Sequence, residues 1–319
     1  MSSTNPISLS TVEPALQSRH RLMFAGTELR VRGRWLRIAR PEMDKYDLPS
    51  DPDAVVAELR KSAGRVDLFT FMQVMPDTAP KYDYPMELDN LAVLPVSTFD
   101  HWWNQQIRSL PRNRARQAEK RGVTLREVTF DEKLAEGIWE VYNETGVRQG
   151  KRNAHFGKDR KQVREEAATF LERSIFIGAF LGDKLIGFAK LVTNAAKTQA
   201  SFMNIVAMVQ HKDKAPTNAL IAHAVKSCAE RGIPNLVYQS LSYGKKHRDS
   251  LAHFKEINGF QQIDLPRYYI PITPFGRAAL RLGLHHRLVE YLPEAVASSL
   301  RALRSAWYNR KSQTLTEAL

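Results

Sequence analysis

The fold of this chain is decided by residues 216–260, which read PTNALIAHAVKSCAERGIPNLVYQSLSYGKKHRDSLAHFKEINGF. The first part predicts a helix over 216–231, because Pro216 suits the first turn of a helix and Gly232 suits the position just past its end. The residues at 220, 224, 227 and 228 also keep the i, i+4, i+7, i+8 spacing of one helix face. This segment is therefore expected to be a helix with one face packed on a core.

A short apolar run follows this helix and predicts a strand. Residues 235–241 read NLVYQSL, a pattern typical of a strand. A second helix then carries Leu251, Phe254 and Lys255, and the stretch closes on the turn Asn258-Gly259-Phe260. A helix, a strand and a second helix in this order are typical of an α/β protein.

The sequence upstream continues this mixture of strands and helices. Its clearest signal is Gly182-Asp183, which lies between the apolar runs 174–181 and 184–191 and predicts a hairpin. The other expected elements are a strand at 123–128, helices at 131–144 and 161–173, and a strand at 199–209. From residue 123 the expected order is β-α-α-β-β-β-α-β-α-β, which predicts an α/β fold with a mixed sheet and a central antiparallel meander.

The part before residue 111 contains no complete α/β cycle. The expected elements there are strands within 27–39, a helix from Asp51-Pro52 to Lys61, strands at 66–74 and 91–96, a helix beginning at Thr98, and then a basic helix at 111–121. We therefore expect four regions: a flexible tail at 1–20, an abbreviated N-terminal α/β subdomain at 21–110, the main domain at 111–272, and a basic amphipathic helical tail at 273–319.

Composition indicates a folded and basic protein. Hydrophobic residues make up 43% of the 319, which excludes wholesale disorder, and no apolar run approaches the roughly 18 residues of a membrane span. The N-terminus lacks the pattern of a secretory signal, and the single cysteine, Cys228, excludes an internal disulfide, so a cytoplasmic protein is expected. The net charge of +13, concentrated at 108–126 and 145–164, favours an anionic partner.

The order of elements and two motifs resemble known acyltransferases. The order resembles that of the GNAT acyl-transfer domain, over roughly residues 98–272. The run RNRARQAEKRGV at 112–123 resembles the RN-x-x-R-x-AEK-x-G-V segment of FemAB-like proteins, and Glu144-Thr145 with Arg148 resembles the ET-x-x-R turn of that family. The resemblance implies a GNAT-like acyl-CoA N-acyltransferase fold, in which one strand splays away from its neighbour and a helix begins at the donor's phosphates.

Acyl transfer requires an anchored donor, and the loop 211–218 is the candidate anchor. It enters the N-terminus of the 216–231 helix, where free backbone N–H groups and the helix dipole attract anions. GNAT enzymes usually carry glycines at this point, whereas this chain has Ala215 and Thr217, and Pro216 lacks an N–H donor. The alternative is an ordinary surface turn. The expected donor contacts are Lys212, Lys214, Thr217 and Asn218.

The resemblance places the donor's pantetheine arm along the strand 199–209. Main-chain groups from Val206 to Met208 would pair with that arm, and Asn204 is the one polar residue among apolar neighbours.

The reaction centre is expected at the end of the 235–241 strand. Tyr238 and Ser240 would share one face of that strand by its period of two, and Tyr243 follows at its carboxyl end, where open α/β sheets bind ligands. Either tyrosine could protonate the leaving thiolate, as a tyrosine often does in GNAT sites. The alternative for Tyr238 is a place in the hydrophobic core.

Glu144 is the candidate general base, because the resemblance puts the end of its helix beside the acceptor cleft. The alternatives are a surface carboxylate and deprotonation through water. No metal site is expected, and the pair His285-His286 is interpreted as part of a surface helix. The candidate acceptor-binding residues are Arg148, Arg152, Asn204 and Lys245.

The last part of the chain predicts two helices, at 275–292 and 294–308. The second is basic and amphipathic, which suits either packing on its own domain or lying on an anionic membrane. The sequence thus predicts an N-acyltransferase that uses acyl-CoA and an amine acceptor. Two alternatives stay open: a FemAB-like transferase that uses aminoacyl-tRNA or an acyl carrier protein, and a non-catalytic module that binds RNA or, peripherally, the inner face of the membrane.

Overall fold

The structure, a computed structural model, describes residues 21–62, 66–148, 151–242 and 250–286. Its strands are β1 (Arg21–Phe24), β2 (Thr27–Arg32), β3 (Ile38–Pro41), β4 (Leu68–Met72), β5 (Met86–Pro95), β6 (Val123–Val128), β7 (Val147–Arg148), β8 (Lys151–Arg152), β9 (Ser174–Leu181), β10 (Lys184–Thr193), β11 (Ala200–Ala207), β12 (Asn235–Val237) and β13 (Gln261–Pro271). Strands β7 and β8 form a separate pair, and the others form one sheet in the order β1-β2-β3-β4-β13-β5-β12-β11-β10-β9-β6.

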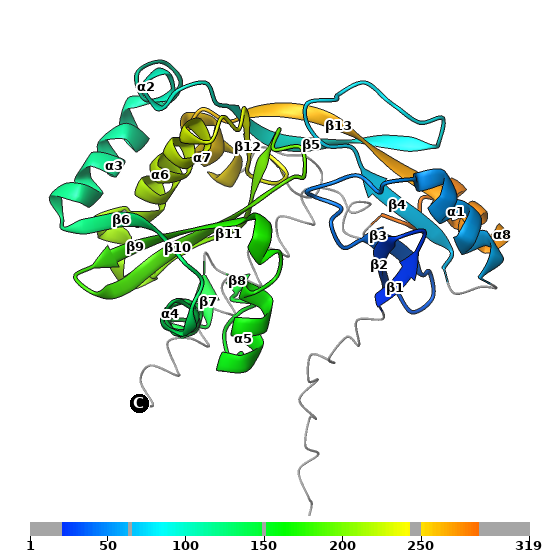
Figure 1. Cartoon of the computed structure of the whole chain (residues 1–319), viewed down its shortest axis with the longest axis horizontal. Helices are drawn as coiled ribbons and strands as arrows, with labels where there is room; N and C mark the ends of the chain where they lie inside the picture. The colour runs from blue at the N-terminus through cyan, green and yellow to red at the C-terminus, as the bar shows by residue number, and fades with distance from the viewer. Residues whose placement is uncertain (1–20, 63–65, 149–150, 243–249, 287–319) are drawn as a thin grey trace, which may run out of the picture.

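The helices cover both faces of this sheet. They are α1 (Pro52–Lys61), α2 (Phe99–His101), α3 (Ser109–Lys120), α4 (Glu132–Asn143), α5 (Arg160–Ala167), α6 (Pro216–Glu230), α7 (Ser250–Ile257) and α8 (Pro274–Arg281). Figure 1 shows α3, α6 and α7 on one side of the β9–β11 strands and α4 and α5 on the other. Side chains cap the N-termini of several helices. Asp51 accepts a hydrogen bond from the Ala54 N–H at the start of α1, and Asp131 accepts one from the Leu134 N–H at the start of α4.

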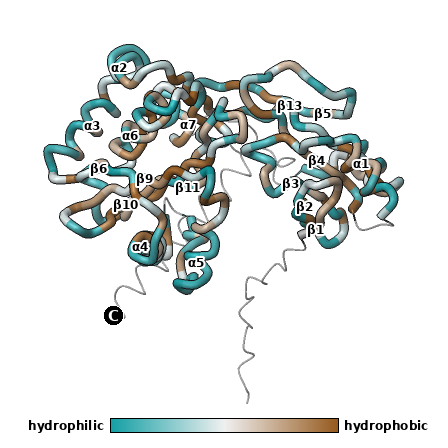
Figure 2. The backbone as a smooth tube through the Cα atoms, viewed as in Figure 1, coloured by the Kyte–Doolittle hydropathy of each residue, from teal (hydrophilic) through white to brown (hydrophobic). Residues whose placement is uncertain are grey.

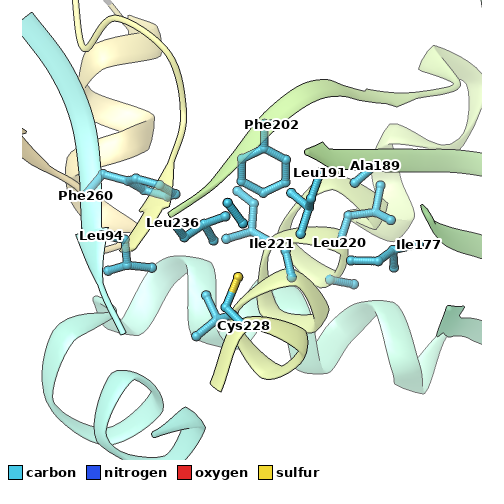
Figure 3. Packing of buried hydrophobic residues seen from close by; sticks show 14 of the residues in the cluster. Leu94, Ile177, Ala189, Leu191, Phe202, Leu220, Ile221, Cys228, Leu236 and Phe260 are labelled. Atoms are coloured by element: carbon cyan, nitrogen blue, oxygen red, sulfur yellow. The ribbon is translucent and has the colours of Figure 1, made fainter. Parts of the chain in front are cut away.

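The core lies where β9, β10 and β11 meet α6. The predicted hairpin is confirmed, because β9 and β10 pair antiparallel across Gly182-Asp183, with Lys184 opposite Leu181. Leu220, Ile221 and Cys228 of α6 are completely buried against these strands, as Figure 3 shows. Burial raises the pKa of the Cys228 thiol to about 12, which suits a packing role. In Figure 2 the hydrophobic colour gathers along these elements, and the outer helix α3 is largely hydrophilic.

The two halves of the molecule share the strands in the middle of the sheet. β13 lies between β4 and β5 and is antiparallel to both, so the last strand of the predicted 111–272 domain completes the sheet of the 21–110 region. A contact across the halves reinforces this continuity. Asp47 forms an ion pair with Arg173, the Gln199 amide donates to the Lys45 carbonyl at 3.1 Å, and the Tyr46 and Phe170 rings lie 5.6 Å apart.

Several element boundaries differ from the prediction; the strand expected at 91–96, for example, begins at Met86. The strand expected at 235–241 ends at Val237, because Gln239 has a φ of +49° and turns the chain. The helix expected at 161–173 is α5, which ends at Ala167 and is followed by a separate 3-10 turn at Leu171–Arg173. The helix expected at 275–292 ends at Arg281, where Leu282 caps it and Gly283 follows with a φ of +69°.

No helix among the described residues is long and apolar enough to cross a membrane. The tail predicted at 1–20 and the helix predicted at 294–308 lie outside the described residues.

Candidate active site

Strands β11 and β12 diverge, as the GNAT resemblance implies. They pair in parallel only at Ala200–Leu236 and Ser201–Val237. Beyond that point β11 continues to Ala207 and pairs with β10 alone among the described strands. The β10–β11 register shifts between Lys190 and Leu191, near the point where β11 and β12 stop pairing. The sheet therefore opens as a V, with its vertex at Ser201 and Val237.

A small cavity of about 50 Å³ lies at this vertex. Both halves of the molecule contribute to its wall. The loop after β3 and strands β4, β5 and β13 supply one side, and β11 and the segment after β12 supply the other. The lining residues are Lys45, Tyr46, Met72, Asp89, Leu91, Ser201, Phe202, Val237, Gln239, Ser240 and Arg267.

A buried ion cluster forms the floor of the cavity. Arg267 is 5% exposed; its Nη1 donates to Asp44 Oδ2 at 3.0 Å and its Nε to Asp89 Oδ2 at 2.5 Å. Asp44 also accepts from the Met72 N–H at 2.9 Å. Desolvation opposes the charge on Arg267, but the carboxylates of Asp44 and Asp89 outweigh it, so the pKa of Arg267 is raised. The guanidinium is therefore a fixed positive charge under the cavity.

Lys45 supplies an amino group at the same wall. Its Nζ donates to Gln239 Oε1 at 3.4 Å. The residue is exposed as a whole, yet desolvation lowers the pKa of its ammonium; Asp44 opposes this and Arg267 adds to it. Behind Ser240, the completely buried Lys255 donates to the Ser240 carbonyl at 2.5 Å. The segment after β12 is thus held by α7 on one side and meets Lys45 on the other.

Of the three residues expected at the reaction centre, Ser240 lines the cavity and Tyr238 does not. The Tyr238 ring is partly buried and packs on Phe202 and Phe260 of the main core cluster, with centroid distances of 5.1 and 5.8 Å. The expectation of a shared face was wrong because the strand ends at Val237, so the period of two does not continue to Ser240. Tyr243 and Lys245 lie outside the described residues.

The predicted phosphate turn is the 3-10 segment η3 (Val209–Lys214), which lies at the mouth of the V. Ala215 follows in the left-handed region with a φ of +53°, a conformation that glycine adopts more readily, and Pro216 begins α6. Lys212 is exposed. Lys214 is paired with Asp213, whose carboxylate also accepts from Arg121 Nη1 at 3.0 Å. The carboxylate of Asp213 therefore partly neutralises the positive charge of this turn.

Glu144 occupies the amides that begin this turn. Its Oε2 accepts from the Val209 N–H at 2.9 Å and its Oε1 from the Gln210 N–H at 2.7 Å. Arg148 lies beside it, 3.3 Å from Oε2, and donates to the Ala207 carbonyl at 2.6 Å. The motif residues Glu144 and Arg148 are thus brought together, and their contacts fix the end of β11. The predicted role of Glu144 as a base stays a prediction.

The other candidate residues are distributed along β11 and its surroundings. Asn204 is half-buried opposite Lys190, Val206 packs partly buried in the cluster beneath α4, and the Met208 N–H donates to the Ile186 carbonyl at 2.8 Å. Thr217 and Asn218 are half-buried in the first turn of α6, and Arg152 is exposed in β8.

The two basic runs differ in how far acids neutralise them. In the second run, Arg160 and Arg164 form ion pairs with Glu136 and Glu132. In the first run, the exposed Arg114 and Arg116 of α3 have no carboxylate partner among the described residues, and Arg116 lies 5.4 Å from the centroid of the Trp103 ring. Helix α3 packs beside η3 and α6, so this uncompensated positive face borders the mouth of the V.

A larger groove, of about 730 Å³, lies between α4 and the β9–β10 hairpin. It is lined by both signs of charge, including Arg126 and Asp183, and by apolar side chains such as Phe180. None of the predicted site residues borders it.

His155 gives a pH-dependent prediction. Burial, and then the nearby Lys158, lower the pKa of His155 to about 4 from 6.5. Between these values the unfolded chain binds a proton that the folded chain does not, so stability is lost as the pH falls through this window. After allowance for partial exposure we expect a loss of about 1–2 kcal/mol. Urea unfolding across the window should show this slope in the wild type and a smaller slope in His155→Phe, which preserves the stacking on Tyr142; equal slopes would contradict it.

Sequence reasoning did not find the part of the site that comes from the first region. Lys45, Asp89 and Arg267 line the cavity but carry no motif. The available signal was indirect: Arg267 is followed by the apolar run Tyr268 to Ile270, where a buried charge requires a partner.

Comparisons with known proteins were made for sequence and for structure. No family model matches the sequence, and no curated protein matches it. Many solved structures resemble it, and three of them resemble it over most of both chains with TM-scores above 0.5. The C-terminal domain of a putative lysylphosphatidylglycerol synthetase from Agrobacterium fabrum is 14% identical, with coverage of 82% of this chain and 86% of that one and a TM-score of 0.54. L-PGS from Bacillus licheniformis is 13% identical, with coverage of 76% and 81% and a TM-score of 0.55.

The third structure is FemX, which is 12% identical, with coverage of 75% of this chain and 83% of that one and a TM-score of 0.53. At such identities the likeness concerns the fold. Together with the divergence of β11 and β12 and the position of α6, it confirms the prediction made from the element order and motifs. The chain therefore has the fold of these three structures, in agreement with the GNAT-like, FemAB-like fold predicted from the sequence.

Proposed function

We propose that the protein transfers an acyl group, here an aminoacyl group, from a tRNA carrier to an amine acceptor. The observation that carries this proposal is the cavity at the vertex between β11 and β12, where both halves of the sheet converge. Its volume of about 50 Å³ accommodates one end of an acyl group, whereas sites for whole small ligands measure roughly 300–1,000 Å³. The bulk of the donor must then lie outside the cavity, on the protein surface.

The contacts of the η3 turn argue against coenzyme A as that donor. The Glu144 carboxylate already accepts from two amides of the turn, and its negative charge would repel a diphosphate. Asp213 adds a second negative charge, and Pro216 offers no N–H. Arg148 donates a hydrogen bond to the Ala207 carbonyl, which is therefore not available to pair with a pantetheine arm. The acyl-CoA donor expected from the GNAT resemblance is therefore the less supported alternative.

The α3 face supports a polyanionic carrier. Its arginines at 114 and 116 have no carboxylate partner among the described residues, and Lys120 is exposed on the same helix. Phosphate backbones bind to such surfaces by releasing counterions, so that several separate cations contribute together. The resemblance to FemAB-like proteins implies aminoacyl-tRNA as donor, and one structural neighbour is named for a product, lysylphosphatidylglycerol, that contains an amino acid.

The reaction would proceed at the cavity wall. The acceptor amine attacks the ester carbonyl carbon of the donor, so that a C–N bond forms, the C–O bond to the tRNA ribose breaks, and the amine proton passes to the leaving hydroxyl. Lys45 and Ser240 are two side chains at the wall that can donate to the developing oxyanion, and the lowered pKa of Lys45 suits it to exchange a proton. Arg267 acts through Asp89 as a positioning residue.

Binding of tRNA is expected to depend on α3. The double variant Arg114→Gln, Arg116→Gln should weaken tRNA binding and reduce the slope of log affinity against log salt by about 2, because each cation that meets a phosphate contributes nearly one unit. The matched control is Arg160→Gln, Arg164→Gln, which removes two arginines that are already paired with glutamates. Filter binding over a salt series measures both. Equal slopes for the two double variants would remove tRNA from the proposal.

Further arms of the same experiment separate the alternatives. Acyl carrier protein that binds in place of tRNA, with the same dependence on α3, would change the donor and keep the transfer reaction. Coenzyme A that binds tightly and is lost on replacing Lys212 and Lys214 would restore the acyl-CoA donor. Bound tRNA without transfer to any amine would indicate a non-catalytic RNA-binding module. Anionic vesicles that bind independently of α3 would place a membrane contact in residues 273–319.

A further inference from the structure

Three side chains of types that bind metals converge at the start of the central strand β5, away from the motifs that predicted the active site. The Nε2 atoms of His285 and His286 lie 3.0 and 3.1 Å from the same oxygen, Oε1 of Glu87. The ligand atoms of the three residues all lie within 4.8 Å of one another. The sequence interpretation of both histidines as surface residues is wrong for His285, because its side chain is only 3% exposed.

The backbone brings these residues together from distant parts of the chain. Glu87 lies near the start of β5, opposite Arg267 of β13. Helix α8 ends at Arg281, and a tight turn follows, in which the Leu284 N–H donates to the Ala279 carbonyl at 2.9 Å. This turn directs the chain back over the sheet, where the His285 ring packs 4.6 Å from the Tyr269 ring. The position of His285 is therefore fixed by packing before any ligand binds.

We propose that Glu87, His285 and His286 form a binding site for a divalent transition-metal ion, with Zn²⁺ as the best fit. Bonds of about 2.0–2.1 Å in a tetrahedron place neighbouring ligand atoms roughly 3.3 Å apart. The two nitrogen–oxygen distances are already close to that value, so a small opening of the cluster admits the ion. Three protein ligands leave the fourth position for water or an external ligand.

The donor set selects the type of metal. Two imidazole nitrogens and one carboxylate suit Zn²⁺ and its neighbours in the first transition row. Mg²⁺ and Ca²⁺ prefer sites made wholly of oxygen and should bind poorly. The Nδ1 atom of His285 is buried with no hydrogen-bond partner among the described residues, so its Nε2 carries the polar interactions of the ring.

Metal binding would tie the segment after α8 to β5. Without the metal, this link includes the hydrogen bond between His285 Nε2 and Glu87 Oε1 and the close approach of His286 Nε2, at 3.1 Å, to the same oxygen. Glu87 is two residues from Asp89, on the same face of β5, so the site lies beside the ion cluster under the cavity. The inference concerns the metal alone and does not depend on the proposed transfer reaction.

The test is a Zn²⁺ titration of the full chain, freed of any histidine tag and stripped of metal with a chelator. Calorimetry should show one equivalent bound, and Co²⁺ in its place should give the visible absorption of a four-coordinate ion. Glu87→Gln, which preserves the shape and an acceptor oxygen, should weaken Zn²⁺ binding at least tenfold, and His286→Gln should do so as well. The matched control is His253→Gln, because His253 is exposed on α7 and far from the cluster in sequence.

Each outcome decides the proposal. His285→Ala could destabilise the packed turn, so the two glutamine variants, checked by circular dichroism, carry the test. Binding of one Zn²⁺ that is weakened by both variants and unchanged in His253→Gln supports the site. The proposal is overturned if the wild type binds no stoichiometric Zn²⁺, or if Glu87→Gln binds it as tightly as the wild type does. In either case the cluster is a hydrogen-bonded clamp without a metal.

Discussion

Replacing Arg267 with methionine is expected to cost about 3–5 kcal/mol of unfolding free energy, because it leaves the buried Asp44 carboxylate without its positive partner. Asp44 exposes only 9% of its side chain and lies 3.0 Å from the guanidinium, so water cannot readily replace the lost charge. Asp89 is 39% exposed and can be solvated after the change. Urea unfolding, followed by circular dichroism, measures the loss.

A second variant separates the charge effect from the loss of packing. Adding Asp44→Asn to Arg267→Met removes the unpaired charge and retains an acceptor for the Met72 N–H, so a substantial part of the stability should return. The control is Arg164→Met, whose ion pair with Glu132 is exposed and should contribute less than about 1 kcal/mol. If the double variant is no more stable than Arg267→Met alone, the loss comes from packing and the charge argument fails.

Local signals were sufficient for much of the C-terminal half. Strands 123–128 and 174–181 have the predicted bounds, and the helix that begins at Pro216 ends within one residue of its prediction. The ends of these elements are marked by local sequence signals: a two-residue turn at 182–183 and a glycine at 232. Such signals act between neighbours in the sequence, so a reading of the sequence alone can find them.

The end of β12 shows where local signals fail. The residues after Val237 remain compatible with a strand, and Gln239 gives no sign that it adopts a left-handed conformation, which glycine or asparagine would favour. Tertiary contacts set the bend: the Gln239 amide donates to the Phe202 carbonyl at 3.2 Å, and Lys255 holds the Ser240 carbonyl. The alternation of a strand therefore predicted that Tyr238 and Ser240 share one face, whereas the strand ends at Val237 and only Ser240 lines the cavity.

The cavity could not be predicted because its residues meet only in the sheet. Asp44 and Arg267 are far apart in the chain and become neighbours since β13 is inserted between β4 and β5. The same is true of Glu87 and His285. The order of strands in the first region is not encoded by any repeat or motif, so sequence reasoning yielded the motifs of the second half and missed the residues that complete the site.

Filling the cavity is expected to abolish transfer while leaving the fold and tRNA binding intact. Ser240→Trp would place an indole in a cavity of about 50 Å³, so the acyl end of the donor could no longer reach Lys45. Displacing a reacting group by about 1 Å can cost a hundredfold in rate, and exclusion of the group should cost more. The measurement is acyl transfer from charged tRNA to amines, with tRNA binding followed in parallel.

Ser97→Trp, at an exposed position after β5, is the matched control. Undiminished transfer by Ser240→Trp would move the reaction centre away from this vertex, whereas loss of tRNA binding along with transfer would show that the donor's carrier, and not only its acyl end, occupies the V.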